Sequence, residues 1–89
     1  MSEAHWESIK NSANADMKQG HYAEALVKYE DVLSGLESVN AEANPELCAM
    51  LVACLNNSSM AYLHLQRYEQ CVITCTRGLN IQEDNLKVS

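Results

Sequence analysis

The sequence predicts an all-α protein made of antiparallel helix-turn-helix units, and three observations support this fold class. Apolar residues recur at helical spacing, as in Ala25, Leu26, Tyr29 and Val32. Only one proline and three glycines interrupt the chain, and the intervals between them lack the alternation of strands. The sequence also matches itself when it is shifted by 46 residues, which predicts two copies of one structural unit.

The first helical hairpin is predicted to occupy about residues 3–39. Ser2 can cap its first helix, and Gly20 can end that helix because glycine readily adopts the left-handed conformation found after a helix. The second helix is expected to begin near Tyr22 and to continue to the end of this repeat. Gly35 lies inside it and should weaken its last turns by about 1 kcal/mol relative to alanine.

The second hairpin is predicted to occupy about residues 45–80, after a polar linker at 40–44. Asn44 is a suitable helix cap, and Pro45 fits the first helical position, where its missing N–H is not needed. This third helix should reach about Leu65. The hairpin order is therefore helix, turn, helix, repeated twice.

A fourth helix is expected from about Tyr68 to Leu79. Asp84 then provides a cap for a further helix. Residues 84–89 are predicted to begin a third helix pair, which is cut short. Residues 1–89 are thus interpreted as one domain, because the chain is too short for two ordinary domains.

Composition excludes several classes of function. Twelve acidic and six basic residues give a net charge of -6, which argues against nonspecific binding to nucleic acid or to anionic membranes. No segment approaches the roughly 20 apolar residues of a membrane span, and the polar N-terminus does not resemble a signal peptide. We therefore expect a cytoplasmic protein with reduced cysteines rather than a disulfide framework. The cysteines are Cys48, Cys54, Cys71 and Cys75.

The internal repeat brings residues of similar size into register. The aligned pairs include Ser12 with Ser58, Tyr22 with Tyr68, Ala25 with Cys71 and Leu33 with Leu79. The segment 20–29, GHYAEALVKY, resembles the core of a tetratricopeptide repeat (TPR), a family of paired helices with a 34-residue period. The 12 additional residues fit a longer helix end and linker. The resemblance implies a fragment of a right-handed α-solenoid, with two repeats and the start of a third.

Four polar residues resemble a known peptide-binding pattern. Lys10 and Asn14 are four residues apart and point the same way from the first helix, and Asn57 lies on the matching helix of the second repeat. With Lys87, they resemble the carboxylate clamp of TPR co-chaperones. Such proteins bind the C-terminal Glu-Glu-Val-Asp of heat-shock protein 90 or heat-shock protein 70. The resemblance implies that these four residues bind peptide carboxylates, while the arginine of the pattern would fall at position 91, beyond this chain.

Further side chains are expected to line the same groove, where adaptable methionines would suit the valine of a bound peptide. They are Met17, Lys18, Asn56, Met60 and His64. Packing between helices is an equally good interpretation of this set. All four tyrosines are expected to be core wedges.

Catalytic and metal sites receive little support. Cys71 and Cys75 share a helix face, but no second ligand pair occurs at zinc spacing, and the three histidines are scattered. No pattern indicates a cysteine–histidine nucleophile or a phosphate-binding loop. The sequence therefore predicts a protein that is not an enzyme and that needs no cofactor or metal.

The leading hypothesis is a co-chaperone or adaptor module that binds the acidic tail of heat-shock protein 90 or 70. The alternative is a TPR scaffold or self-association element with no tail ligand. It depends on the outer face of the fourth helix, near Val72, Ile73 and Cys75, which no following hairpin would cover.

Overall fold

The computed structural model describes the backbone of residues 3–39 and 43–88 and the side chains of residues 5–39 and 43–83. Over these residues the chain forms four helices, α1 (Glu3–Lys18), α2 (Tyr22–Ser38), α3 (Pro45–His64) and α4 (Tyr68–Val88). The all-α prediction is confirmed. Ser2, the predicted first cap, lies outside the described residues.

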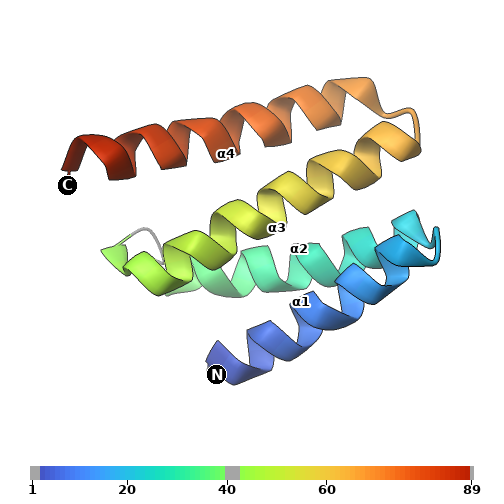
Figure 1. The fold of residues 1–89 in the computed structure, drawn as a ribbon, viewed down its shortest axis with the longest axis horizontal. Helices are drawn as coiled ribbons and strands as arrows, with labels where there is room; N and C mark the ends of the chain where they lie inside the picture. The colour runs from blue at the N-terminus through green and yellow to red at the C-terminus, as the bar shows by residue number, and fades with distance from the viewer. Residues whose placement is uncertain (1–2, 40–42, 89) are drawn as a thin grey trace.

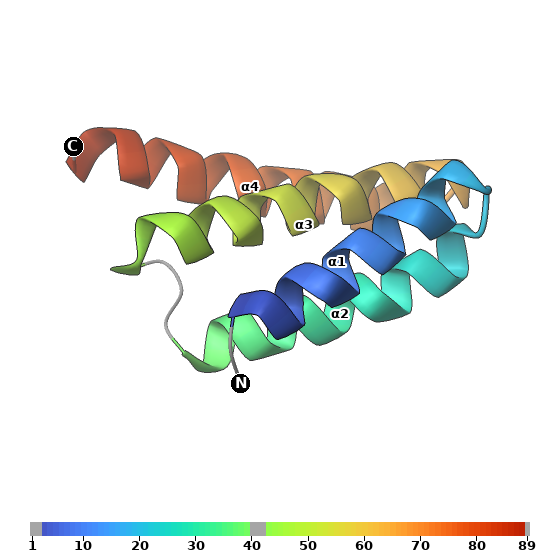
Figure 2. The ribbon, with the colours of Figure 1, turned by 60° about the horizontal axis from the view of Figure 1, so that its bottom comes forward.

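The helices form two antiparallel hairpins that stack on one another. Figure 1 shows them following each other across the molecule, from α1 at the bottom to α4 at the top. Helix α2 packs against α3 and so joins the hairpins, and α1 also contacts α3. In Figure 2, α1 passes in front of α2 while α3 lies in front of part of α4, so the first helices of both hairpins face the same side.

The turns agree with the local sequence signals. Gly20 has a φ of 81°, and Gln66, its counterpart in the second hairpin, has a φ of 60°. Gln66 therefore adopts a left-handed conformation that is unfavourable for a residue with a Cβ. At the start of α3, Asn44 Oδ1 accepts hydrogen bonds from the Glu46 and Leu47 amides at 3.0 Å and 3.3 Å. Pro45 follows this cap, as the sequence predicts.

The core lies where the two hairpins meet. Its largest fully buried side chains come from α2 and α3 and include Tyr29, Leu36, Leu51 and Leu55. Ala13 and Ala25 are completely buried. Their small side chains let α1 and α2 approach closely. Trp6 is 4% exposed and packs on Gly35 of α2, so this glycine creates space for the indole.

The predicted end of the fourth helix is wrong. Helix α4 continues past Leu79 and past the expected cap at Asp84 to Val88. No glycine or proline follows Gly78 to end the helix. Ile81 is only 8% exposed and packs in the core, so the buried face of α4 continues beyond Leu79. The predicted separate helix at 84–89 is therefore part of α4 as far as Val88.

One predicted core wedge is also wrong. Tyr29 is fully buried, but Tyr68 is 59% exposed. It lies at the start of α4, the outermost helix of the described stack, where no further helix covers it. Within the described residues, no helix has the length and apolarity needed to cross a membrane.

Candidate functional site

A groove lies on the side of the molecule where α1 and α3 are neighbours. It contains a shallow pocket of about 440 Å³. Three of the five residues predicted to line the groove contribute to this pocket, together with both predicted amides and a tyrosine of α2. The lining residues are Asn14, Met17, Lys18, Tyr29, Asn57 and Met60. We refer to this set as the groove pocket.

Two carboxamides from different hairpins meet in the groove pocket. Asn57 Nδ2 donates a hydrogen bond to Asn14 Oδ1 at 3.0 Å, and the Tyr29 hydroxyl donates to the same oxygen. Asn14 Oδ1 thus accepts from two donors, which fixes the orientation of its amide. Among the described residues, Asn14 Nδ2 has no hydrogen-bond partner, so its two N–H groups remain to donate to a ligand.

Tyr29 belongs to the site as well as to the core. Its side chain is fully buried in α2, and burial raises the pKa of its phenol above the ordinary value because the phenolate would lose solvation. Tyr29 is therefore a neutral donor at physiological pH. The sequence predicts Tyr29 only as a core wedge. The missed signal is that a buried tyrosine hydroxyl normally requires a hydrogen-bond partner.

Lys10 lies one helical turn before Asn14 on α1 and is only partly exposed. Its ammonium pairs with Glu7 Oε1 at 3.3 Å. Burial raises the pKa of the Cys54 thiol on α3 to about 11, and the positive charge of Lys10 opposes this rise. Lys10 is not among the residues that line the groove pocket.

The remaining predicted residues lie in four different places. Met17, Lys18 and Met60 line the groove pocket together with the two amides. The placement of Asn56 in the groove is wrong, because its Oδ1 lies beside Gly78 of α4, about 100° around α3 from Asn57. His64 stacks on Tyr22 near the α1–α2 turn, with ring centroids 4.3 Å apart. The side chain of Lys87 lies outside the described residues.

One acidic cluster has the composition of a metal site. The ligand atoms of Asp16, His21 and Glu24 lie within 4.8 Å of one another. However, Asp16 already accepts a 2.6 Å ion-pair contact from Lys28, and the other two side chains are exposed. This arrangement is explained by local ion pairing between the two helices of the first hairpin.

Sequence comparison relates this chain to parts of longer proteins. It is 29% identical over 82 residues to the peptidyl-prolyl cis-trans isomerase FKBP4 of Mus musculus. The matched stretch covers 89% of this chain and 18% of the isomerase. It is 27% identical over 79 residues to sperm-associated antigen 1A of Danio rerio, again covering 89% of this chain and 18% of the relative. The rat sperm-associated antigen 1 is 26% identical over 84 residues, which is 8% of its length.

The chain therefore spans less than a fifth of the length of these relatives. No protein-family model and no solved structure matches it. The stacked helical hairpins have the arrangement that the TPR resemblance of the sequence implies.

Proposed function

We propose that this chain is a protein-interaction module whose groove pocket binds the acidic C-terminal tail of heat-shock protein 90 or heat-shock protein 70. It would act in the cytoplasm as a co-chaperone or adaptor for whatever it is attached to. The observation that carries the proposal is the hydrogen bond between Asn57 and Asn14. It joins one amide from each hairpin beside the methionines of the groove pocket, and Lys10 lies one turn before Asn14 on α1.

The donors in the groove suit a free chain end. A C-terminal aspartate presents two carboxylates, one from its side chain and one from its backbone. Asn14 Nδ2 can donate directionally to one of them, and Lys10 and Lys18 supply positive charge on the same helix. Each hydrogen bond to a charged group contributes about 1.5–3 kcal/mol. Several such bonds, together with apolar contacts to Met17 and Met60, would give a binding free energy near that of a micromolar complex, which is about 8 kcal/mol.

The net charge of -6 opposes an acidic ligand, but its effect is local. Charges further away than about 8 Å are largely screened at physiological salt. The acidic residue that matters most is Glu7, because it pairs directly with the Lys10 ammonium. A bound carboxylate would have to compete with this side chain. An exposed pair of this kind is weak, so the exchange costs little.

The proposal is tested by calorimetric titration of a peptide that ends in Glu-Glu-Val-Asp. Lys10→Ala and Asn14→Ala should each weaken binding about tenfold or more, since each removes a bond to a charged group. The amidated peptide should also bind much more weakly than the free acid. Unchanged affinity in both variants, with helicity preserved by circular dichroism, would refute the site.

Two charge variants sharpen the test. Glu7→Gln should tighten tail binding severalfold, because it frees Lys10 from its acidic partner. Arg67→Gln is the matched control, since it removes one positive charge at the α3–α4 turn, away from the groove pocket. Equal weakening by Arg67→Gln and Lys10→Ala would show that affinity reflects net charge rather than this site.

A second candidate function is self-association through α4. Val72 is 64% exposed and Leu79 is 56% exposed, and both lie on the outer side of the last described helix. A repeat hairpin normally buries such a face against a neighbour. We infer that a second copy of the chain is the simplest cover for it.

A further inference from the structure

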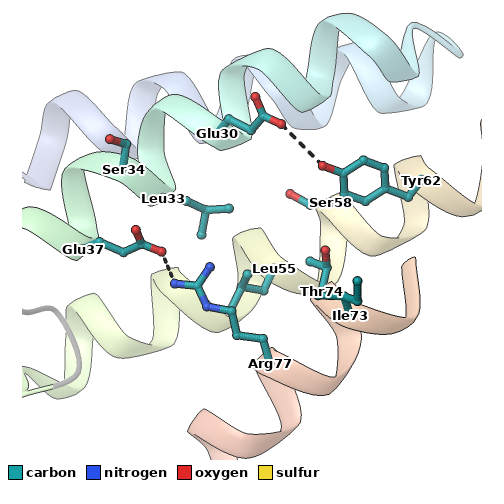
Figure 3. Close-up of a pocket in the computed structure, with 10 residues that line it drawn as sticks. All are labelled: Glu30, Leu33, Ser34, Glu37, Leu55, Ser58, Tyr62, Ile73, Thr74 and Arg77. Atoms are coloured by element: carbon teal, nitrogen blue, oxygen red, sulfur yellow. Dashed lines mark hydrogen bonds and ion pairs between the residues drawn. The ribbon is translucent and has the colours of Figure 1, made fainter. Parts of the chain in front are cut away.

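A second pocket lies between α2, α3 and α4 and shares no lining residue with the groove pocket. Its volume is about 280 Å³. Figure 3 shows side chains from all three helices converging on it, with Leu33 and Leu55 among its apolar walls. We call it the α2–α4 pocket. No predicted clamp residue contributes to it, so its use is independent of tail binding.

Ser58 provides the observation that points to a ligand. It is 2% exposed, and its Oγ has no hydrogen-bond partner among the described residues. The hydroxyl points into the space between Leu33 and Tyr62 in Figure 3. A buried hydroxyl without a partner is unfavourable, because it has lost its bonds to water and gained none in return. A ligand atom at this position would satisfy it.

The polar groups around Ser58 favour a ligand that donates hydrogen bonds and carries positive charge. Glu30 lies at the rim and accepts only one long contact, 3.4 Å from the Tyr62 hydroxyl. Glu37 also lies at the rim, and its carboxylate pairs with the guanidinium of Arg77 across the pocket (Figure 3). One basic and two acidic side chains therefore line the pocket, and Glu30 has acceptor capacity left.

We propose that the α2–α4 pocket binds an arginine side chain of a partner polypeptide. The aliphatic part of that side chain would pack on Leu33 and Leu55, while its N–H groups would donate to Ser58 Oγ and to the Glu30 carboxylate. A guanidinium has five donors in a fixed planar arrangement and can serve both acceptors at once. The volume is just below the usual range for small-molecule sites, about 300–1,000 Å³, and suits one long side chain.

The test uses N-acetyl-L-argininamide as the probe, titrated into isotope-labelled protein and followed by NMR. We expect saturable shifts of the Leu33, Leu55 and Ile73 methyl groups at millimolar probe. Ser58→Ala and Glu30→Gln should each weaken binding about threefold to tenfold. Ser58→Ala should be as stable as the parent protein in thermal unfolding, because the hydroxyl it removes has no partner.

Ser59→Ala is the matched control. Ser59 is also buried, but its hydroxyl donates to the Asn56 carbonyl at 2.7 Å and does not line the pocket. This variant should lose stability and keep its probe affinity. Asn14→Ala should likewise leave probe binding unchanged, so failure of the tail site and failure of this pocket are distinguishable.

Four results would overturn the proposal. They are absence of saturable pocket shifts, equal binding of N-acetyl-L-leucinamide, tighter binding of N-acetyl-L-lysinamide, and full affinity in Ser58→Ala. Marked destabilisation by Ser58→Ala would also count against it, since the hydroxyl would then have a structural partner within the protein.

Discussion

Asn14 is the residue that connects the polar side chains of the groove pocket. Its carbonyl oxygen accepts from Asn57 of the other hairpin and from Tyr29 of its own hairpin. These two bonds use the acceptor end of the amide and leave the donor end for a ligand. Preorganisation of this kind lowers the entropic cost of binding, because the amide is already ordered in the free protein.

Tyr29→Phe tests whether this positioning matters. Removing the hydroxyl leaves the core volume almost unchanged but frees Asn14 to rotate. We expect tail-peptide affinity to fall about twofold to tenfold, the effect of one ordinary hydrogen bond. The preference for free acid over amidated peptide should shrink as well, which a general loss of stability would not cause.

Tyr62→Phe is the control for this substitution. Tyr62 is a half-buried tyrosine that contacts Glu30 outside the groove pocket. Calorimetric titration of both variants, well below their unfolding temperatures, should show weaker binding only for Tyr29→Phe. A parallel loss in both would mean that the Tyr29 hydroxyl has no special role in the site.

Cys54 predicts how stability depends on pH. Burial raises the pKa of its thiol to about 11 from the ordinary value of 9.0. Between these values the folded protein keeps the proton and the unfolded chain releases it, so the free energy of unfolding falls as pH rises. The contribution of Cys54 is roughly 2 kcal/mol, lost between about pH 9 and about pH 11.

Urea denaturation of the parent protein and of Cys54→Ala at pH 8 and pH 10.5 measures this contribution. The alanine variant should be less stable at pH 8 because of the cavity, yet it should lose less stability on going to pH 10.5. Tyr29 and Tyr62 also have raised pKa values through burial, so part of the alkaline loss will remain. Identical pH dependence in both proteins would contradict the assignment to Cys54.

At the scale of the element, sequence signals located helix starts and turns better than the last helix end. Asn44 and Pro45 indicate the start of α3 in the sequence, because a helix cap depends only on the local backbone geometry. The repeat register also placed Gln66 opposite Gly20, and both have positive φ. The end of α4 depends instead on Ile81 packing into the core, a tertiary contact that local sequence does not reveal.

Gly35→Ala shows how packing reverses a propensity argument. By helix propensity alone, alanine should stabilise α2 by about 1 kcal/mol. In the structure, a Cβ at this position would lie 2.5 Å from Trp6 Nε1 and 2.9 Å from Trp6 Cε2. The buried indole cannot move away freely, so we expect a net destabilisation of about 1–3 kcal/mol, measured by urea or thermal unfolding.

Gly78→Ala provides the comparison on α4. Its added Cβ would lie 3.3 Å from Asn56 Oδ1 and 3.6 Å from Leu55 Cβ, and the exposed Asn56 side chain can move. This variant should therefore be clearly more stable than Gly35→Ala. A rise in unfolding temperature for Gly35→Ala would show that Trp6 does not pack on this glycine as described.

At the scale of the whole molecule, hairpin stacking determines which polar residues can act together. Asn14 and Asn57 are 43 residues apart in sequence, yet stacking of the hairpins brings their side chains into hydrogen-bond contact. The α2–α4 pocket could not be predicted in this way, because Ser58, Glu30 and Arg77 belong to three helices and have no shared motif. Tail binding by Lys10, Asn14 and Asn57 stays a prediction.

Within the described part of the chain, the same stacking leaves the outer face of α4 without a neighbouring helix. Four exposed residues at successive turns of α4 share this face, at spacings of four, three and four residues, and we call them the α4 stripe. They are Tyr68, Val72, Cys75 and Leu79. A regular row of exposed apolar side chains is typical of an interface. We therefore expect two copies of the chain to associate through it at high protein concentration.

Analytical ultracentrifugation under reducing conditions, which prevent a Cys75 disulfide, tests this association. The average mass of the parent chain should rise with concentration, and the double variant Val72→Lys, Leu79→Lys should remain monomeric, because paired charges on the stripe would repel the second copy. Val27→Lys is the control, since Val27 is 61% exposed but lies on α2. If Val27→Lys dissociates the protein equally, or if the parent mass does not change with concentration, the α4 stripe is not the interface.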